Sequence, residues 1–177
     1  KSQVYKCKVA AFEDTKSAQL GSYLATDLEM DPDESVIWVI DPEDYKADVL
    51  FVFENGRAVR VALAGYVTKT NRKRLKNAIY GGSRLLYAQV LKEDRDLALV
   101  SNDGRLMNFN TSLLKTKTTT NTQGVRAFTA KKNRVVTAVG AIEDFLGSEA
   151  WTEKFTAQAL PCAGALMKED DMPSLFD

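Results

Sequence analysis

Two segments of this chain repeat one short pattern, an apolar run followed by a glycine turn. The first segment, Val49–Arg57, reads Val-Leu-Phe-Val-Phe-Glu-Asn-Gly-Arg, and the second, Leu97–Arg105, reads Leu-Ala-Leu-Val-Ser-Asn-Asp-Gly-Arg. Asn-Gly and Asp-Gly are strong hairpin signals, because both residues of a type I′ turn need a positive φ. Gly56 and Gly104 are 48 residues apart. A hairpin that recurs at this spacing indicates an array of repeated β-units.

Further β-rich segments follow each turn. The second, third and fourth strands of the two complete units are expected at Ala58–Leu63 and Leu106–Phe109, near Ala78 and at Val125–Thr129, and at Arg84–Leu91 and Arg134–Val139. An earlier unit is expected to contribute its second, third and fourth strands from Gln3–Ala10, Gly21–Ala25 and Ser35–Ile40. Units of 40–50 residues with four short strands are typical of the blades of a propeller-like array.

We therefore predict an all-β fold made of one partial domain. Its parts are a truncated first blade at 1–48, a second blade at 49–96, a third blade at 97–144 and a C-terminal tail at 145–177. The tail is expected to form a short helix over Ser148–Leu160, with Trp151, Phe155 and Leu160 docked on the last blade, and an acidic, disordered end from Lys168. A helical fold is disfavoured because the second and fourth strands are β-rich and the glycine turns recur often.

The residue types of the chain exclude several kinds of catalytic site. It contains no histidine, and its two cysteines, Cys7 and Cys162, are far apart in the sequence. Histidine-based acid–base catalysis and a zinc site are therefore not expected, and two lone cysteines fit a reducing compartment such as the cytoplasm. The acidic stretches Asp31–Glu34 and Pro42–Asp44 lie beside proline between apolar runs, which favours turns over catalytic carboxylate pairs. We expect no catalytic residue, cofactor or metal in this part of the chain.

Charge is balanced overall but segregated along the chain, which carries 24 basic and 24 acidic residues. The stretch 1–48 holds five basic and eleven acidic residues, whereas 55–85 and 104–134 hold no acidic residue. A basic surface attracts phosphates whatever the net charge elsewhere. The predicted phosphate contacts are the cations of these two blocks: Arg57, Arg60, Lys69, Arg72, Lys73, Arg74, Lys76, Arg84, Arg105, Lys115, Lys117, Arg126, Lys131, Lys132 and Arg134.

Three segments in repeat register resemble a known family. Residues 121–126, Asn-Thr-Gln-Gly-Val-Arg, followed by Asn133–Val139, resemble the repeat of the C-terminal domain of bacterial DNA gyrase A, which the corresponding cleavage subunit of topoisomerase IV shares. Phe51–Val61 resembles the opening hairpin of that repeat, and Gln3–Val9 resembles the second strand of another blade. The resemblance covers roughly Gln3–Glu143.

The resemblance implies a β-pinwheel, a disc of four-stranded blades, here incomplete. It implies that a basic rim binds, bends and wraps duplex DNA and presents it to the cleavage core of an ATP-dependent type IIA topoisomerase. The implied partners are duplex DNA, the rest of the cleavage subunit and the separate ATPase subunit, with ATP and Mg²⁺ used elsewhere in the parent enzyme, in the bacterial cytoplasm at the nucleoid and without a membrane. The family's catalytic tyrosine follows an arginine, and this sequence has no Arg-Tyr pair.

One departure from the family bears on the parent enzyme. Gyrase carries a glycine-rich basic box, whereas the nearest segment here, Thr68–Lys76, is basic and has no glycine. This favours a topoisomerase IV-like protein or a divergent gyrase, and the stretch Arg72–Lys76 is the strongest candidate for DNA contact. A propeller-like protein-interaction module without nucleic-acid binding is the alternative, and an enzyme on a propeller scaffold is a remote third.

Overall fold

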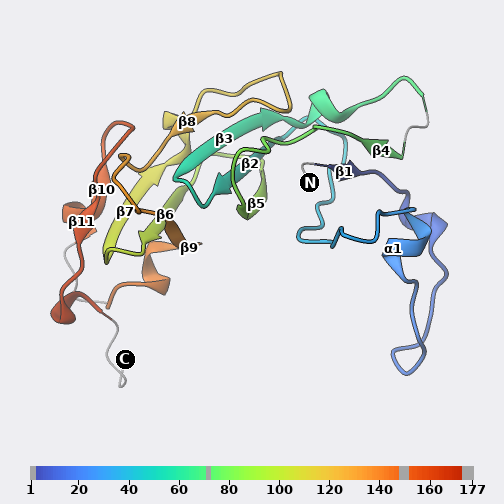
Figure 1. The fold of residues 1–177 in the computed structure, drawn as a ribbon, viewed down its shortest axis with the longest axis horizontal. Helices are drawn as coiled ribbons and strands as arrows, with labels where there is room; N and C mark the ends of the chain where they lie inside the picture. The colour runs from blue at the N-terminus through green and yellow to red at the C-terminus, as the bar shows by residue number, and fades with distance from the viewer. Residues whose placement is uncertain (1–2, 71–72, 148–151, 173–177) are drawn as a thin grey trace.

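The computed structural model describes residues 3–70, 73–147 and 152–172. The sheets follow one another along an arch, with the N-terminal unit at one end and the C-terminal tail at the other (Figure 1). Two hairpins form the middle of the arch: β2 (Asp48–Phe53) with β3 (Arg57–Ala62), and β6 (Asp96–Ser101) with β7 (Arg105–Asn110). These hairpins lie where the repeat predicts them, and the predicted all-β fold is confirmed.

The turns of the two hairpins differ from the predicted type I′ geometry. Each loop has three residues, and among the described residues of these loops only Gly56 (φ +78°) and Gly104 (φ +71°) have a positive φ. The amide of Gly56 donates to the carbonyl of Phe53, as expected for a turn that closes on a left-handed glycine. Asn55 and Asp103 are thus released from the left-handed region.

Each sheet takes one strand from the following unit. The strands β5 (Leu85–Leu91) and β9 (Val136–Gly140) pair with the first strand of their own unit, as predicted. The short third strands β4 (Arg74–Leu75) and β8 (Val125–Arg126) instead pair with β1 (Val4–Tyr5) and β3, the second strands of the preceding units. We call such a short strand, which completes the sheet of the preceding unit, an exchange strand.

Three apolar clusters fill the spaces between successive sheets. Leu50 and Val52 on one face of β2 pack toward the third unit, together with Leu99 and Phe109. The other face of β2, including Phe51, packs toward the first unit, and a third cluster joins β6 and β7 to the tail. Because β2 is buried on both faces, it is a continuous apolar run rather than an alternating one.

The first unit differs from its prediction. The segment predicted as its third strand contains the four-residue helix α1 (Leu24–Asp27) instead. Residues 35–40, predicted as its fourth strand, are not part of any sheet. Both predictions were wrong because a strand needs a neighbour to satisfy its backbone groups, and none of the described residues lies beside these segments as a paired strand.

The tail also departs from its prediction. Thr152–Phe155 forms a short 3-10 helix (η5), and Thr156–Ala157 (β10) and Ala165–Leu166 (β11) pair with β7, so the predicted helix is wrong over residues 156–160 and Ser148–Trp151 lie outside the described residues. Phe155 docks on the last sheet as expected and is 1% exposed. The acidic end is ordered over Glu169–Asp171 (η6), where Asp171 accepts from Lys154 at 2.9 Å.

The remaining short helices connect the strands. They are η1 (Val9–Ala11), η2 (Leu63–Tyr66), η3 (Thr111–Leu113) and η4 (Ile142–Asp144). Within the described ranges, no helix has the length and apolar character needed to cross a bilayer.

Candidate nucleic-acid interface

Two basic segments occupy equivalent places on neighbouring sheets. The segment around β4 lies along β1, and the segment that leads into β8 lies along β3, where Lys117 donates its amide to the carbonyl of Arg60. Both segments run along the same upper edge of the arch in Figure 1. Strand exchange therefore brings the two acid-free blocks of the sequence to one side of the molecule.

Six lysines of these blocks are exposed, and none of them forms an ion pair with another described residue. They are Lys69, Lys73, Lys76, Lys115, Lys117 and Lys132, hereafter the six exposed lysines. Their ammonium groups are available to a ligand without the loss of an internal partner. Arg72, which belongs to the strongest predicted stretch, lies outside the described residues.

Arg60 is held inside the protein by two carboxylates. Its side chain is 17% exposed, and it donates to Asp48 at 2.6 Å and to Asp94 at 2.5 Å. Thr116 also donates to Asp48, which ties the segment before β8 to the base of β2. A phosphate would have to displace two acids to reach this guanidinium, so its geometry favours a structural role.

Arg74 joins the first unit to the second. It donates to both carboxylate oxygens of Asp31, at 3.1 and 2.5 Å, and its side chain lies over the ring of Tyr5. Glu34 accepts from Tyr5 and lies 3.7 Å from the same guanidinium. The predicted turn around Asp31–Glu34 is present, and its acids hold this arginine.

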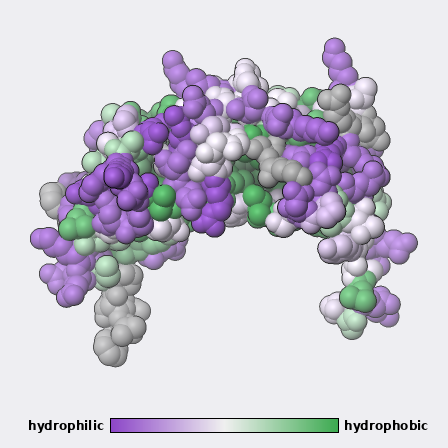
Figure 2. All heavy atoms as spheres, viewed as in Figure 1, coloured by the Kyte–Doolittle hydropathy of each residue, from purple (hydrophilic) through white to green (hydrophobic). Residues whose placement is uncertain are grey.

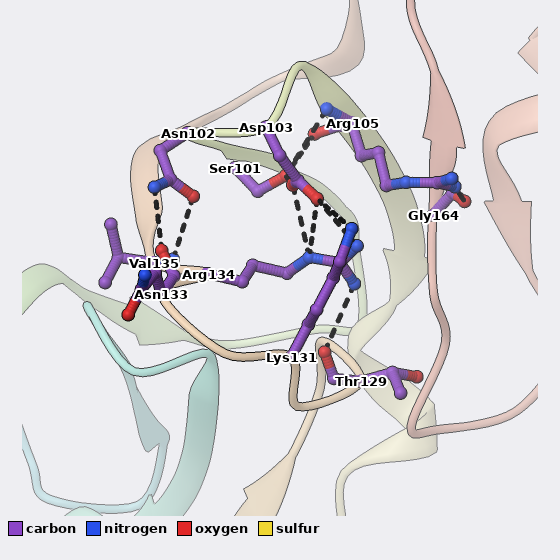
Figure 3. Close-up of polar contacts among 10 residues, drawn as sticks. All are labelled: Ser101, Asn102, Asp103, Arg105, Thr129, Lys131, Asn133, Arg134, Val135 and Gly164. Carbon is purple, nitrogen blue, oxygen red and sulfur yellow. Dashed lines mark hydrogen bonds and ion pairs between the residues drawn. The ribbon is translucent and has the colours of Figure 1, made fainter.

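Arg134 is the most enclosed of the predicted contact residues with a carboxylate partner. Its side chain is 7% exposed, and it makes three hydrogen bonds to the carboxylate of Asp103, at 2.8 to 3.1 Å, and one to the carbonyl of Thr129 (Figure 3). Lys131 approaches Asp103 to 3.7 Å. The hydrogen bonds from Arg134, and then the one from Ser101, hold the pKa of Asp103 well below its usual range.

Arg84 pairs with Glu54 at 3.0 Å but stays 69% exposed, so this pair is weak and can open. Arg126 donates to the carbonyl of Asn55 beside the first hairpin turn. These two arginines are thus partly engaged within the protein.

The arginine after each turn glycine makes one repeated contact. Arg57 donates to the carbonyl of Gly124, and Arg105 donates to the carbonyl of Gly164. Both acceptor glycines have a positive φ, +61° and +66°. Arg57 and Arg105 therefore clamp the exchange segment of the next unit, which leaves them less free for a ligand.

This repeated contact shows that the tail imitates a further unit. β11 pairs with Arg105 and Leu106 in the same register in which β8 pairs with Arg57 and Ala58. Sequence reasoning missed this correspondence, because the shared signal is only a glycine followed by two strand residues, Gly124-Val125-Arg126 and Gly164-Ala165-Leu166. The spacing of 40 residues also differs from the 48 of the hairpins.

Comparison with solved structures identifies this arrangement. The C-terminal domain of DNA topoisomerase IV matches 97% of the chain with a TM-score of 0.77 and 19% identity. The chain has the fold of these topoisomerase C-terminal domains, the β-pinwheel. The E. coli ParC C-terminal domain matches 86% of it with a TM-score of 0.63 and 14% identity. No protein-family model and no curated protein sequence matches the chain.

The match confirms the predicted resemblance at the level of the fold. The chain spans 58% of the length of the first of these structures and 68% of the second. At these low identities the fold is shared while the binding residues are not transferred, so the candidate interface of this pinwheel depends on its own charges.

The three exchange positions of the pinwheel differ in charge. Basic segments fill the first two positions, on β1 and β3, whereas the third, on β7, is filled by the tail. The stretch 143–177 contains eight acidic residues against Lys154 and Lys168. A negatively charged ligand is therefore expected to follow the first two positions and to avoid the third.

Proposed function

We propose that this chain is a DNA-binding domain from the cleavage subunit of a type IIA topoisomerase, and that it holds duplex DNA along the two basic exchange positions. The observation that carries the proposal is the placement of two acid-free segments, with their six exposed lysines, on equivalent edges of adjacent sheets. Lysines that contact phosphates supply affinity and position with little readout of base sequence.

The shape of the edge favours bending of the duplex. Successive sheets turn along the arch, so the edge that bears the basic segments is convex in Figure 1. A duplex that touches both segments has to curve around this edge, which costs on the order of 1–6 kcal/mol for a short site. Several ammonium–phosphate contacts are needed to offset that cost, and the six exposed lysines meet the need.

In this proposal the domain has no catalytic role of its own. It controls DNA topology by bending or wrapping duplex and presenting it to the cleavage core in the rest of its own subunit, while the separate ATPase subunit uses ATP and Mg²⁺. The proposed setting is the bacterial cytoplasm, at the nucleoid. The absence of glycine from Thr68–Lys76 supports a topoisomerase IV-like parent or a divergent gyrase.

The alternative, a protein-interaction module, predicts binding through an apolar face and weak salt dependence. On the face shown in Figure 2, hydrophobic residues form small separate groups among the described residues, within a mostly hydrophilic surface. This distribution supports the nucleic-acid proposal on that face.

A duplex-binding titration across a salt series tests the proposal. If each of the six exposed lysines neutralises one phosphate, the plot of log affinity against log salt has a slope of about −5, at roughly 0.9 per contact. The triple variant Lys69→Gln, Lys73→Gln, Lys76→Gln is expected to reduce that slope to about −3. The matched control is Lys8→Gln, Lys16→Gln, Lys46→Gln, three exposed lysines of the acidic first unit. Equal affinity and slope in the two triple variants would refute the assignment.

A further inference from the structure

The two complete sheets share one strand order. The order β5-β2-β3-β8 in the second unit corresponds to β9-β6-β7 followed by the tail strands in the third, so each sheet runs fourth strand, first strand, second strand, exchange strand. The first sheet contains β1 and β4 alone, which are its second strand and its exchange strand. The positions of the first and fourth strands are not occupied by a paired strand of the described residues.

The segment expected at the fourth position is nevertheless present. Residues 36–40 read Val-Ile-Trp-Val-Ile, an unbroken apolar run of the kind that forms a buried strand. In the structure Val36, Ile37, Trp38 and Val39 are 43–79% exposed. Within the described ranges, no backbone hydrogen bond involves residues 35–40. The run thus has the composition of a sheet strand and lacks the neighbouring strand that would satisfy it.

Both ends of this run are anchored. At one end Glu34 accepts hydrogen bonds from Tyr5 and Gln3, which belong to or adjoin β1. At the other end Ile40 packs into the apolar cluster between the first and second units. Only long side chains link the run to β1, which leaves the backbones free to accept a strand between them, since adjacent strands lie about 4.8 Å apart.

The cluster between the first two units is also thin on the side of the first unit. Its fully buried members come from 49–88, whereas the first unit contributes the partly buried Val4, Ile40, Tyr45 and Ala47. In the cluster between the second and third units, by contrast, both sheets contribute fully buried residues, for example Leu50 and Leu99. A strand in the vacant first position of the first sheet would supply the missing apolar side chains.

We propose that the space between β1 and residues 36–40 is an acceptor site for one β-strand of the same repeat. The occupant is an apolar strand like β2, joined to the beginning of β1 through an Asn-Gly or Asp-Gly turn, as β2 is joined to β3. It pairs antiparallel with β1 on one side and with residues 36–40 on the other. The side chains at the positions of Leu50 and Val52 point into the cluster shared with the second unit, in the way those two residues point toward the third.

The opposite end of the array supports this choice of occupant. There β7 would also be left without its exchange strand, but β11 of the tail takes that position in the register of β8. The array is therefore completed at its C-terminal end by a strand that imitates the repeat. The same device at the other end requires a first strand, because the second and exchange strands are already in place.

The test is a variant with residues 48–56 copied in front of Gln3 in place of Lys1 and Ser2. The matched control carries the same extension with Leu50→Asp and Val52→Asp in the copy. Hydrogen exchange of the amides of residues 36–40 is measured, together with the fluorescence of Trp38 in a Trp151→Phe background, where Trp38 is the single tryptophan.

With the apolar extension the amides are expected to exchange at least about tenfold more slowly than in the control, and the emission of Trp38 to move to shorter wavelength. Equal exchange rates and emission in the two extended proteins would overturn the proposal. Slow exchange of residues 36–40 in the chain without an extension, accompanied by a dimeric mass and dependent on concentration, would also overturn it, because a second copy would then fill the site.

Discussion

Arg134 separates a structural reading of the basic residues from a nucleic-acid reading. The change is Arg134→Ala, which removes three hydrogen bonds to Asp103 and one to the carbonyl of Thr129. It also removes the guanidinium from the ring of Phe128, 5.7 Å away, which is itself 2% exposed. The turn between β6 and β7 then loses its tie to the beginning of β9.

The expected cost follows from the burial of the two partners. Breaking a fully buried ion pair costs about 3–5 kcal/mol, because one charge stays buried without a partner. Asp103 is 29% exposed and still accepts from Ser101, so water and that hydroxyl compensate part of the loss. We expect a loss of about 2–3 kcal/mol in the free energy of unfolding, which corresponds to a fall in Tm of about 4–12 °C for a chain of this length.

Thermal unfolding by circular dichroism and duplex titration across a salt series are the two measurements. The control is Lys132→Ala, which removes an exposed cation two residues away and is expected to leave Tm unchanged while making the salt slope shallower by about one. Arg134→Lys keeps the charge but loses the fork geometry, so its Tm is expected to fall as well. An Arg134→Ala variant with unchanged Tm and a shallower salt slope would refute the structural reading.

Three further predictions use other described residues. Because Asp103 has a lowered pKa in the folded state, the stability of its pair is present above about pH 4 and lost at lower pH; between pH 5 and 2 the wild type should lose more stability than Asp103→Asn, measured by urea unfolding. Gly124→Ala should cost more than about 1 kcal/mol, because φ is +61° and the new Cβ would lie 2.3 Å from the carbonyl oxygen of Ala58, whereas Gly21→Ala, with no atom within 4 Å, should be nearly neutral on the same denaturant curve. Tyr66→Phe should cost about 1–3 kcal/mol, since it leaves the buried carbonyl of Ala78 without its donor; unchanged stability would show that water replaces the hydroxyl.

The hairpins could be predicted because their signals are local. An apolar run and a glycine turn are contiguous in the sequence, so Val49–Arg57 and Leu97–Arg105 indicated β2–β3 and β6–β7 within about a residue. The short exchange strands could not be assigned to their sheets, because a two-residue strand such as β8 carries no periodicity. Its partner β3 lies in another unit and is found only when the chain has folded.

The first unit shows the same limit from the opposite side. Residues 36–40 have the composition of a strand, and composition predicted one. The structure leaves them unpaired, because a strand depends on a neighbour as much as on its own side chains. The tail was mispredicted as helical for a related reason: Phe155 and the residues after it are held by β7, which lies about 45 residues earlier in the sequence.

The sequence by itself determined the repeat, the hairpins and the two acid-free blocks, because each of these is a property of neighbouring residues. Only the tertiary structure decided which of the basic residues remain available. Arg74 meets Asp31 across 43 positions, and Arg134 meets Asp103 across 31, so residues from acid-free blocks acquire acidic partners from outside them. The Coulomb interaction depends on the distance between charges in space, and strand exchange sets that distance while leaving the six exposed lysines without a partner among the described residues.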